Sequence, residues 1–320
     1  MLTPKQNAIA ALEMRVPEYI PTFELEFQLE EEFFGERFYD DSIAPETLAK
    51  LTPLEKEKAI CKKAEYLCHV YSSMEWSIFP IIYLGDNGEH FSPETTLLIK
   101  HMKQIVGEKY ALACHGDGTM ALPDGNAMYD FAYALADDPD SVIARAKDAS
   151  ERTIRRNYEA KELGIDVIMM CADYCYNSGP FVSPAMFSEL IFPFLADEIA
   201  HCRKAGLYAI KHTDGNIMPI LDQLIASNPH AIHSLDPMAG VDIAEVKKLT
   251  AGKTAICGNV HCAALQTGSD QDVTDSALYA IKHGKPGGGY IYCTSNVPFK
   301  GMKKERYQMV LDIWKQHRTY

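Results

Sequence analysis

Short apolar segments alternate with amphipathic segments along the second half of the chain. Residues 166–172 form an apolar run of strand length, and residues 208–212, 231–235, 254–257 and 290–293 repeat the pattern. Between these runs, apolar side chains recur at the i, i+3, i+4 and i+7 spacing that is typical of a helix packed on one side. The pattern predicts strands and helices in regular alternation.

Residues that favour helix ends divide the amphipathic segments. Ser183 followed by Pro184 predicts the start of a helix that continues past Leu195, and Gly206 predicts its end. Two further pairs have the spacing of a capping box: Asp242 with Glu245, and Ser269 with Asp272.

Strands that alternate with helices form βαβ units, in which the strands lie parallel. Apolar segments at 19–27, 77–83 and 110–114 precede the five above and bring the strand count close to eight. We therefore predict an α/β fold, a (β/α)8 TIM barrel, that occupies residues 1–320 as a single domain. Residues 28–75 are helix-rich and are expected to form a helical insertion or lid.

An open doubly wound sheet is the alternative, but its nucleotide-binding motif is incomplete. Gly116 and Gly118 have no third glycine in register, and the glycines at 287–289 precede a strand instead of a helix. The length of 320 residues would also allow two domains, although α/β barrels of this size are routinely one.

The chain is acidic. It has 31 basic and 44 acidic residues, a net charge of −13, and 47% hydrophobic residues, which suffice for a large core. Nucleic acids and anionic membranes attract basic surfaces, so neither is an expected partner. The same charge argues against a strongly anionic substrate.

The nine cysteines are an odd number and lie mostly in apolar runs, as reduced and buried thiols do. The first residues contain no cationic segment followed by an apolar stretch, and no window approaches eighteen apolar residues. We therefore expect neither a signal peptide nor a membrane span, and a cytoplasmic location.

In a barrel of this kind, catalytic residues lie at the carboxyl ends of the strands. Polar candidates at these ends are Glu24, Glu26, Asp173, Tyr174, Asn177, His212, Asp214, Asp236, Asn259 and Cys293. Structural alternatives remain open for several of them. The two glutamates also begin an acidic surface segment, the aspartate before Pro237 can form a turn, and a cysteine that ends an apolar strand is usually a core residue.

His212 and Asp214 form the most specific pair among these candidates. Their i, i+2 spacing directs both side chains the same way, and Gly215 after them allows a sharp turn. Together with a cysteine from another strand, such as Cys293, they match the ligand types of a zinc site.

Several motifs in order resemble the uroporphyrinogen decarboxylase superfamily, over nearly the whole chain. They are the opening Thr3-Pro4-Lys5, then Gly164-Ile165-Asp166, Gly179-Pro180-Phe181-Val182-Ser183-Pro184, His212-Thr213-Asp214-Gly215-Asn216, Leu235-Asp236-Pro237-Met238-Ala239-Gly240, Cys257-Gly258-Asn259-Val260 and Gly287-Gly288-Gly289-Tyr290-Ile291. The resemblance implies a (β/α)8 barrel, in agreement with the strand count.

Charge separates the branches of this superfamily. The decarboxylases carry an arginine-rich N-terminal motif that holds the carboxylates of a porphyrinogen. Here no basic residue lies between Arg15 and Arg37, and seven glutamates occupy the interval. The chain therefore resembles the corrinoid-dependent methyltransferase branch. In the zinc enzymes of that branch a His-x-Cys pair and a later cysteine bind the metal; His212 and Cys293 match, and Asp214 replaces the middle cysteine.

The resemblance implies that a methyl group passes from a small methoxylated, aromatic substrate to the Co(I) of a separate corrinoid protein. The chain has no corrinoid-binding Asp-x-His-x-x-Gly motif, so the corrinoid must be supplied by that partner. An oxygen-rich zinc site, or a carboxylic acid, would activate the leaving oxygen of the ether.

The residue roles that follow are expectations. Zinc would be held by His212, Asp214 and Cys293. The acid or fourth ligand would be Glu24, Glu26 or Asp173. Contacts to the substrate would come from Tyr174, Asn177, Asp236 and Asn259.

Three alternatives stay open. One is a decarboxylase-like lyase that acts on a smaller acid with Asp173 or Asp214 as its charged group. A second is methyl transfer from a methylated corrinoid to a thiol. A third is a barrel that binds a tetrapyrrole or corrinoid without turnover. Barrels of this type are often homodimers, but no self-complementary stripe in the sequence fixes the oligomeric state.

Overall fold

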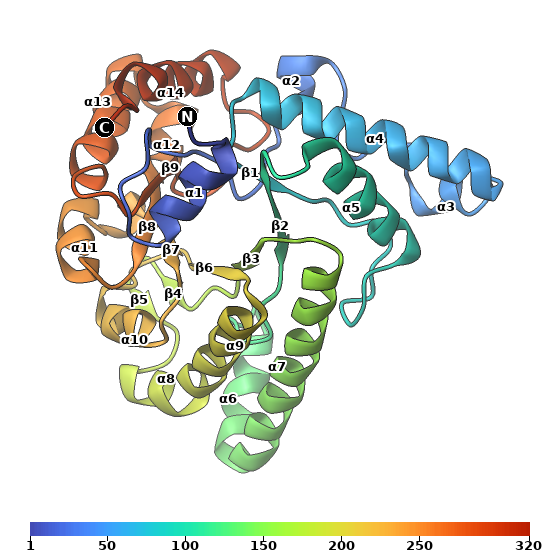
Figure 1. The fold of residues 1–320 in the computed structure, drawn as a ribbon. Helices are drawn as coiled ribbons and strands as arrows, with labels where there is room; N and C mark the ends of the chain where they lie inside the picture. Colours follow the sequence, from blue (N-terminus) through green and yellow to red (C-terminus); the bar gives the residue numbers. More distant parts are fainter.

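The computed structural model describes residues 1–320, and its centre is a parallel sheet of seven strands (Figure 1). In spatial order the strands are β1 (Ile78–Pro80), β2 (Ala111–His115), β3 (Val167–Met170), β6 (Tyr208–His212), β7 (Ala231–His233), β8 (Ala255–Val260) and β9 (Tyr290–Thr294). A separate antiparallel hairpin consists of β4 (Cys175–Tyr176) and β5 (Gly179–Pro180). Each central strand pairs with the next one along the chain, as predicted for βαβ units.

The N-terminal segment closes this curved sheet. Thr22 forms a parallel bridge with Tyr292 of β9, whose N–H donates to the Pro21 carbonyl at 2.9 Å. On the other side, the Ser77 N–H donates to the Thr22 carbonyl at 2.7 Å, next to β1. The strand predicted at 19–27 is thus reduced to two isolated bridges, at Tyr19 and Thr22, because Pro21 between them has no N–H to donate. The predicted TIM-barrel fold is confirmed.

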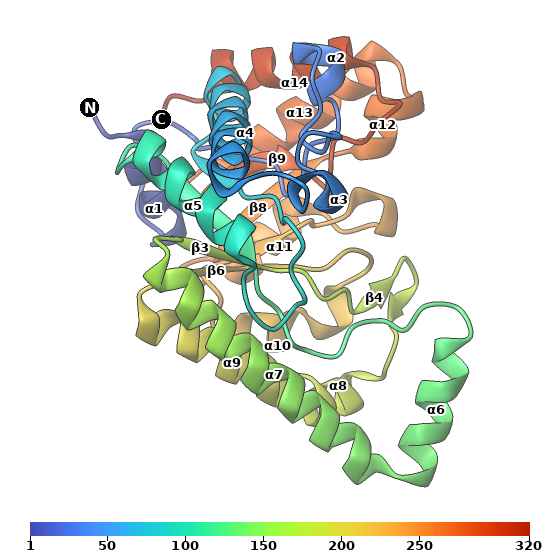
Figure 2. The same cartoon turned by 90° about the vertical axis from the view of Figure 1, so that its right-hand side faces the viewer.

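Helices surround the barrel. They are α5 (Pro93–Val106), α6 (Ala127–Asp137), α7 (Pro139–Glu162), α8 (Pro184–Leu190), α9 (Phe192–Ala205), α10 (Leu221–Ala226), α11 (Ile243–Thr250), α12 (Cys262–Thr267), α13 (Asp270–Gly284) and α14 (Lys304–His317), with 3-10 turns η1 (Met218–Ile220) and η2 (Pro237–Ala239). Hairpin α6–α7 extends away from the barrel in Figure 2.

Two local helix predictions need correction. The helix that starts after Ser183 ends at Leu190 and a second helix begins at Phe192, because Pro193 cannot donate the backbone hydrogen bond needed to continue the first. Asp242 does cap α11, through the Ala244 N–H at 2.9 Å, but without the capping box. The box of Ser269 at α13 is confirmed.

Helix α1 (Pro4–Leu12) covers the amino end of the barrel, over the centre of the strands in Figure 1. Its Ala8, Ala11 and Leu12 belong to the same apolar cluster as inward-facing residues of every central strand. A second, larger cluster fills the space between the strands and the outer helices. The amino end is therefore sealed, and the carboxyl end is left for a site.

The segment 28–75 contains three helices, α2 (Glu30–Phe34), α3 (Pro45–Leu48) and α4 (Pro53–Ser73). Helix α4 packs along α5, and both lie on one side of the barrel in Figures 1 and 2. None of the helices combines the length and the apolar character that crossing a bilayer requires.

Candidate functional site

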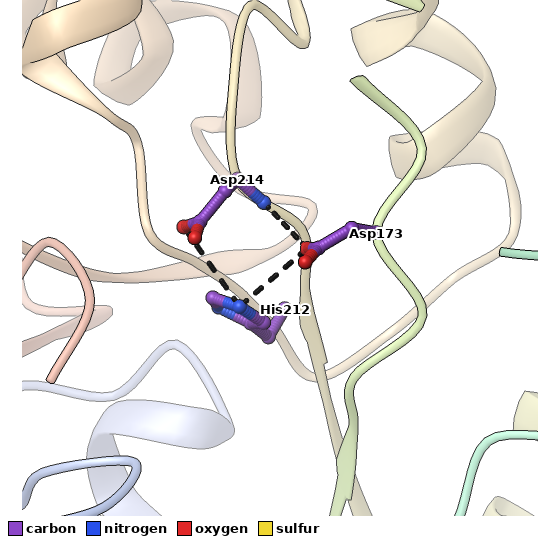
Figure 3. A group of neighbouring side chains, drawn as sticks. All are labelled: Asp173, His212 and Asp214. Atoms are coloured by element: carbon purple, nitrogen blue, oxygen red, sulfur yellow. Dashed lines mark hydrogen bonds and ion pairs between the residues drawn. The ribbon is translucent and has the colours of Figure 1, made fainter. Parts of the chain in front are cut away.

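Three polar side chains meet at the carboxyl ends of β3 and β6: Asp173, His212 and Asp214 (Figure 3). His212 Nε2 lies 3.6 Å from Asp173 Oδ1 and 3.8 Å from Asp214 Oδ1, and the ligand atoms of all three lie within 4.8 Å of one another. The strand register explains the meeting. Met170 pairs with Lys211, and each carboxylate follows its strand residue by three positions.

The loops that carry the carboxylates are tied together. The Asp214 N–H donates to Asp173 Oδ1 at 2.9 Å. The next residue, Gly215, has φ of +80°, and a Cβ there would lie 2.5 Å from the Cys175 carbonyl oxygen. Only glycine allows the loop to pass so close to the β4–β5 hairpin while turning sharply after Asp214.

His212 is held by a second histidine. Its strand neighbour His233 is its register partner, and the two Nδ1 atoms lie 2.8 Å apart. One Nδ1 must therefore donate a proton and the other accept it. When His212 is the donor, its Nε2 presents a lone pair to the two carboxylates. This is the tautomer of a metal ligand.

Burial keeps His212 neutral. It lowers the pKa of the imidazole to about 3, and the positive charge of Lys211 acts in the same direction. A neutral imidazole retains the lone pair that a metal requires. The histidine is therefore in the state to bind a metal or a proton donor.

Asp214 accepts more hydrogen bonds than Asp173. Its Oδ1 accepts a hydrogen bond from Ser234 Oγ at 2.6 Å, and its Oδ2 accepts one from Asn296 Nδ2. Burial raises the pKa of Asp214 to about 7, and the negative charges of Asp173 and Asp236 add to the effect. The pair of carboxylates therefore repels at this site unless a proton or a cation lies between them.

These residues fit a zinc ion. One neutral imidazole nitrogen and two carboxylate oxygens are accepted zinc ligands, and three protein ligands leave one position open. A divalent cation would also relieve the repulsion between Asp173 and Asp214. With two oxygen ligands and no thiolate, the group suits a Lewis-acidic metal.

A buried ion pair supports the loop of Asp173. Lys211, which is fully buried, donates from Nζ to Asp117 Oδ2 at 2.7 Å and to the Ala172 carbonyl at 2.8 Å. Asp117 Oδ2 also accepts the Ala172 N–H at 2.9 Å. The pair thus hydrogen-bonds both the N–H and the carbonyl of Ala172, the residue just before Asp173. The charge and hydrogen bond of Lys211 lower the pKa of Asp117, although burial acts in the opposite direction.

Cys293, expected as a zinc ligand, is not in the group. It is fully buried in the apolar cluster inside the barrel, and burial raises the pKa of its thiol. A neutral thiol in apolar surroundings is a core residue and not a metal ligand. In the structure the group that could hold a metal contains Asp173 as its third residue instead.

Glu24 is not in the group either, although it was expected to be catalytic. It is 2% exposed, and its carboxyl group accepts hydrogen bonds from Thr294 Oγ1 at 2.5 Å and from the Tyr307 hydroxyl at 3.2 Å. Glu26, two residues on, is exposed and lines a cavity beside β1 and β2. The two glutamates, both expected as the acid or fourth ligand, therefore lie in different settings, because the segment is not a regular strand.

The four residues expected to touch substrate lie in different settings. Tyr174 is fully buried and bonded through its hydroxyl to Thr119, so it is a support for Lys211 and not a substrate contact. Asn177 is exposed in the β4–β5 turn. Asp236 caps η2. Asn259 is 6% exposed and donates to the Leu235 carbonyl at 2.8 Å.

Sequence reasoning missed His233, Ser234 and the Lys211–Asp117 pair. One signal was present: Lys211 interrupts an otherwise apolar strand, which requires a buried partner. The other two residues gave no signal, because their contacts depend on neighbouring strands. Ser234 and Leu235 adopt φ of +91° and +51°, a strained turn that directs the serine hydroxyl to Asp214.

Comparison with known proteins gives one family and one fold. The profile of the family described as "Uroporphyrinogen decarboxylase (URO-D)" matches residues 126–316. No curated protein matches the chain in sequence. A solved methyltransferase from Methanosarcina mazei superposes with a TM-score of 0.74 and 14% identity, over 99% of each chain.

Two sugar epimerases are more distant. A D-tagatose 3-epimerase-like protein has a TM-score of 0.46 and 12% identity, over 78% of this chain and 91% of that one. D-psicose 3-epimerase from Clostridium cellulolyticum H10, solved with D-tagatose, has a TM-score of 0.49 and 9% identity, over 79% of this chain and 93% of that one.

Proposed function

Because the chain belongs to the uroporphyrinogen decarboxylase (URO-D) family, we propose that it is a methyltransferase of that family. It would move a methyl group from a small methoxylated, aromatic substrate to the Co(I) of a separate corrinoid protein. The observation that carries the proposal is the Asp173–His212–Asp214 group at the carboxyl end of the barrel. The similarity to the Methanosarcina mazei methyltransferase along the full chain supports it.

Methyl transfer from an aryl ether requires that the leaving oxygen be stabilised. The C–O bond breaks, its electron pair stays on oxygen, and Co(I) supplies the pair for the new bond to carbon. The leaving phenolate is a poor leaving group unless a cation or a proton stabilises it. Asp173, His212 and Asp214 would hold zinc, which supplies Lewis acidity to that oxygen when bound.

The protein contributes position and proton control. His233 would orient the imidazole of His212 through the Nδ1 contact, while Ser234 and Asn296 hydrogen-bond Asp214. In the absence of a cation, Asp214, with a pKa near 7, is the group able to hold a proton at this site near neutrality. The leaving oxygen would therefore be stabilised either by zinc or by that proton.

Two of the alternatives find less support. A decarboxylase-like lyase acts on an acid, whereas the segment between Arg15 and Arg37 is acidic, includes Glu26 near the barrel mouth and offers no cation to hold one. A zinc site that activates a thiol uses thiolate ligands, and Cys293 is buried in the core away from the group.

The experiment uses the purified protein, a reduced corrinoid protein and a methoxylated phenol, and it follows the methylcobalt absorption band. The wild type is expected to produce the band and to contain about one zinc per chain, and His212→Ala to lose both. His317→Ala, an exposed residue far along α14, is the matched control. Undiminished methyl transfer by His212→Ala would refute the proposed role of the group.

A further inference from the structure

A cavity of about 390 Å³ lies at the carboxyl ends of β1 and β2, between these strands and the N-terminal segment. We call it the mouth pocket. Its aromatic walls are Phe27, Phe38, Tyr39, Tyr71 and Tyr83. The rings hold one another in place: Phe38 lies 5.3 Å from Tyr71 between centroids, and the Tyr83 N–H donates to the Tyr39 hydroxyl at 3.1 Å. The volume suits a single aromatic ring with small substituents.

The charged groups that line the mouth pocket are all acidic. Glu26 and Glu30 lie on its wall, and no lysine or arginine does. Glu30 Oε1 accepts the Phe38 N–H at 3.1 Å, whereas its buried Oε2 has no partner. His115 also lines the pocket, but burial lowers its pKa, so it adds no positive charge near neutrality.

The basic side chains around the pocket are engaged elsewhere. Lys63 Nζ bonds to Asp40 Oδ2 at 2.5 Å, and Arg37 Nε bonds to Glu31 Oε2 at 2.7 Å. Arg156 lies 5.3 Å from the centroid of the Tyr83 ring, and its Nη2 lies 3.8 Å from Asp86 Oδ1. No cationic side chain of the pocket is thus available to pair with an anion, whereas two carboxyl groups and five aromatic rings line it and can contact a cation.

We propose that the mouth pocket binds the methyl donor and selects one that carries a positive charge, such as a methoxylated ring with an ammonium substituent. Aromatic faces and carboxylates are the groups that recognise organic cations. A ring that carries a carboxylate would lie against Glu26 and the unpaired oxygen of Glu30, and would be repelled. The identity of the ligand as a methyl donor rests on the proposed function. The preference for a positive charge rests on the residues of the cavity alone.

The pocket adjoins the site. His115, at the end of β2, lines the mouth pocket and is the register partner of Met169 in β3, the strand that leads to Asp173. A donor in the mouth pocket would therefore lie beside the strand that carries Asp173.

The test measures binding without corrinoid, by calorimetry on the purified protein near neutral pH. Three ligands of similar size differ mainly in charge: para-methoxybenzylamine, para-methoxybenzyl alcohol and para-methoxybenzoate. We expect the amine to bind roughly tenfold tighter than the alcohol and the benzoate to bind weakest. Glu26→Gln is expected to reduce the amine-to-benzoate ratio several-fold, whereas Glu57→Gln, on the exposed side of α4, leaves it unchanged.

A second pair of variants tests the aromatic wall. Tyr39→Leu is expected to weaken binding of the amine more than binding of the alcohol. Tyr39→Phe keeps the ring and is expected to retain the wild-type preference for the amine. Benzoate binding as tight as amine binding, no binding of any of the three, or a charge order that neither Glu26→Gln nor Tyr39→Leu alters, would each overturn the inference. If the charge order holds but no methyl transfer occurs, the proposed function fails and the pocket assignment stands.

Discussion

His212 obtains its state from the residues around it. Burial and neighbouring positive charge keep it neutral, and the Nδ1 of His233 at 2.8 Å couples the tautomers of the two rings. Hydrogen bonds of this kind, to the nitrogen that does not face the metal, set both the orientation and the basicity of a ligating histidine. His233 is therefore expected to influence the metal affinity of the site without touching the metal.

His233→Phe tests that expectation. The substitution keeps an aromatic ring inside the barrel but removes the nitrogen that pairs with His212. Zinc affinity is expected to fall about 10- to 100-fold, as measured by competition with a chromogenic chelator. His317→Phe serves as the surface control. An unchanged affinity in His233→Phe would show that His212 needs no such partner.

Lys211→Met is expected to destabilise the fold. The lysine is fully buried, and its removal leaves the Asp117 carboxylate without its cation next to the Asp173 loop. Breaking one side of a buried pair costs about 3–5 kcal/mol, which urea denaturation would measure. The double variant Lys211→Met with Asp117→Asn removes both charges and should recover much of that loss. A double variant no more stable than the single one would contradict this account.

At the scale of elements, the N-terminal segment completes the barrel with few backbone hydrogen bonds. Glu24 compensates by joining this segment to β9 and α14 through Thr294 and Tyr307. Burial raises the pKa of Glu24 to about 8, so the joint consists of a neutral carboxylic acid at neutral pH. The stability that Glu24 contributes through these contacts must therefore depend on pH.

Glu24→Gln is expected to change that dependence. The folded state keeps the Glu24 proton up to about pH 8, whereas the unfolded chain releases it near its ordinary value of 4.5. The contribution of this group to stability is therefore complete below pH 4.5 and is lost as pH rises toward 8. Glutamine has no proton to lose, so the variant should gain stability over the wild type by up to about 4 kcal/mol between pH 5 and 8.

Urea midpoints of both proteins across this pH range provide the measurement. Glu57→Gln, exposed on α4, should run parallel to the wild type. Parallel curves for Glu24→Gln and the wild type would mean that Glu24 is ionised in the folded protein.

Most elements could be predicted from the sequence, because each depends on residues near one another in the chain. The alternation of strands and helices, and the capping box of Ser269, are local properties. The exceptions have local causes as well. Pro193 divides one predicted helix into α8 and α9, and Pro21 prevents a regular strand in the closing segment.

At the scale of the whole molecule, both chain ends take part in barrel closure. The Ile20 N–H donates to the Arg318 carbonyl at 2.8 Å, and Tyr19 forms an antiparallel bridge with Thr319. The Arg318 guanidinium bonds to Glu75 at 2.7 Å and lies over the ring of Trp314. The C-terminal residues therefore hold the closing segment at Tyr19 and Ile20, in addition to the bonds that join it to β9 and to Ser77 before β1.

Deletion of residues 318–320 is expected to lower stability by about 2–4 kcal/mol, the sum of two or three hydrogen bonds and one partly buried ion pair. Because the lost contacts all act on the closing segment, hydrogen exchange of the Tyr292 amide should accelerate in the same variant. A stable truncated protein with an unchanged Tyr292 amide would show that closure does not depend on the tail.

The sequence by itself determined the order of strands and helices, the barrel class, and the presence of His212, Asp214 and Asp173 at one end of it. These features follow from periodicity and from the rule that parallel strands bring their carboxyl ends to one side. Tertiary structure decided which side chains meet. The register of β6 with β3 and β7 brings Asp173 and His233 to His212 and leaves Cys293 in the core. Contacts across neighbouring strands depend on register and burial, which no short stretch of the chain encodes.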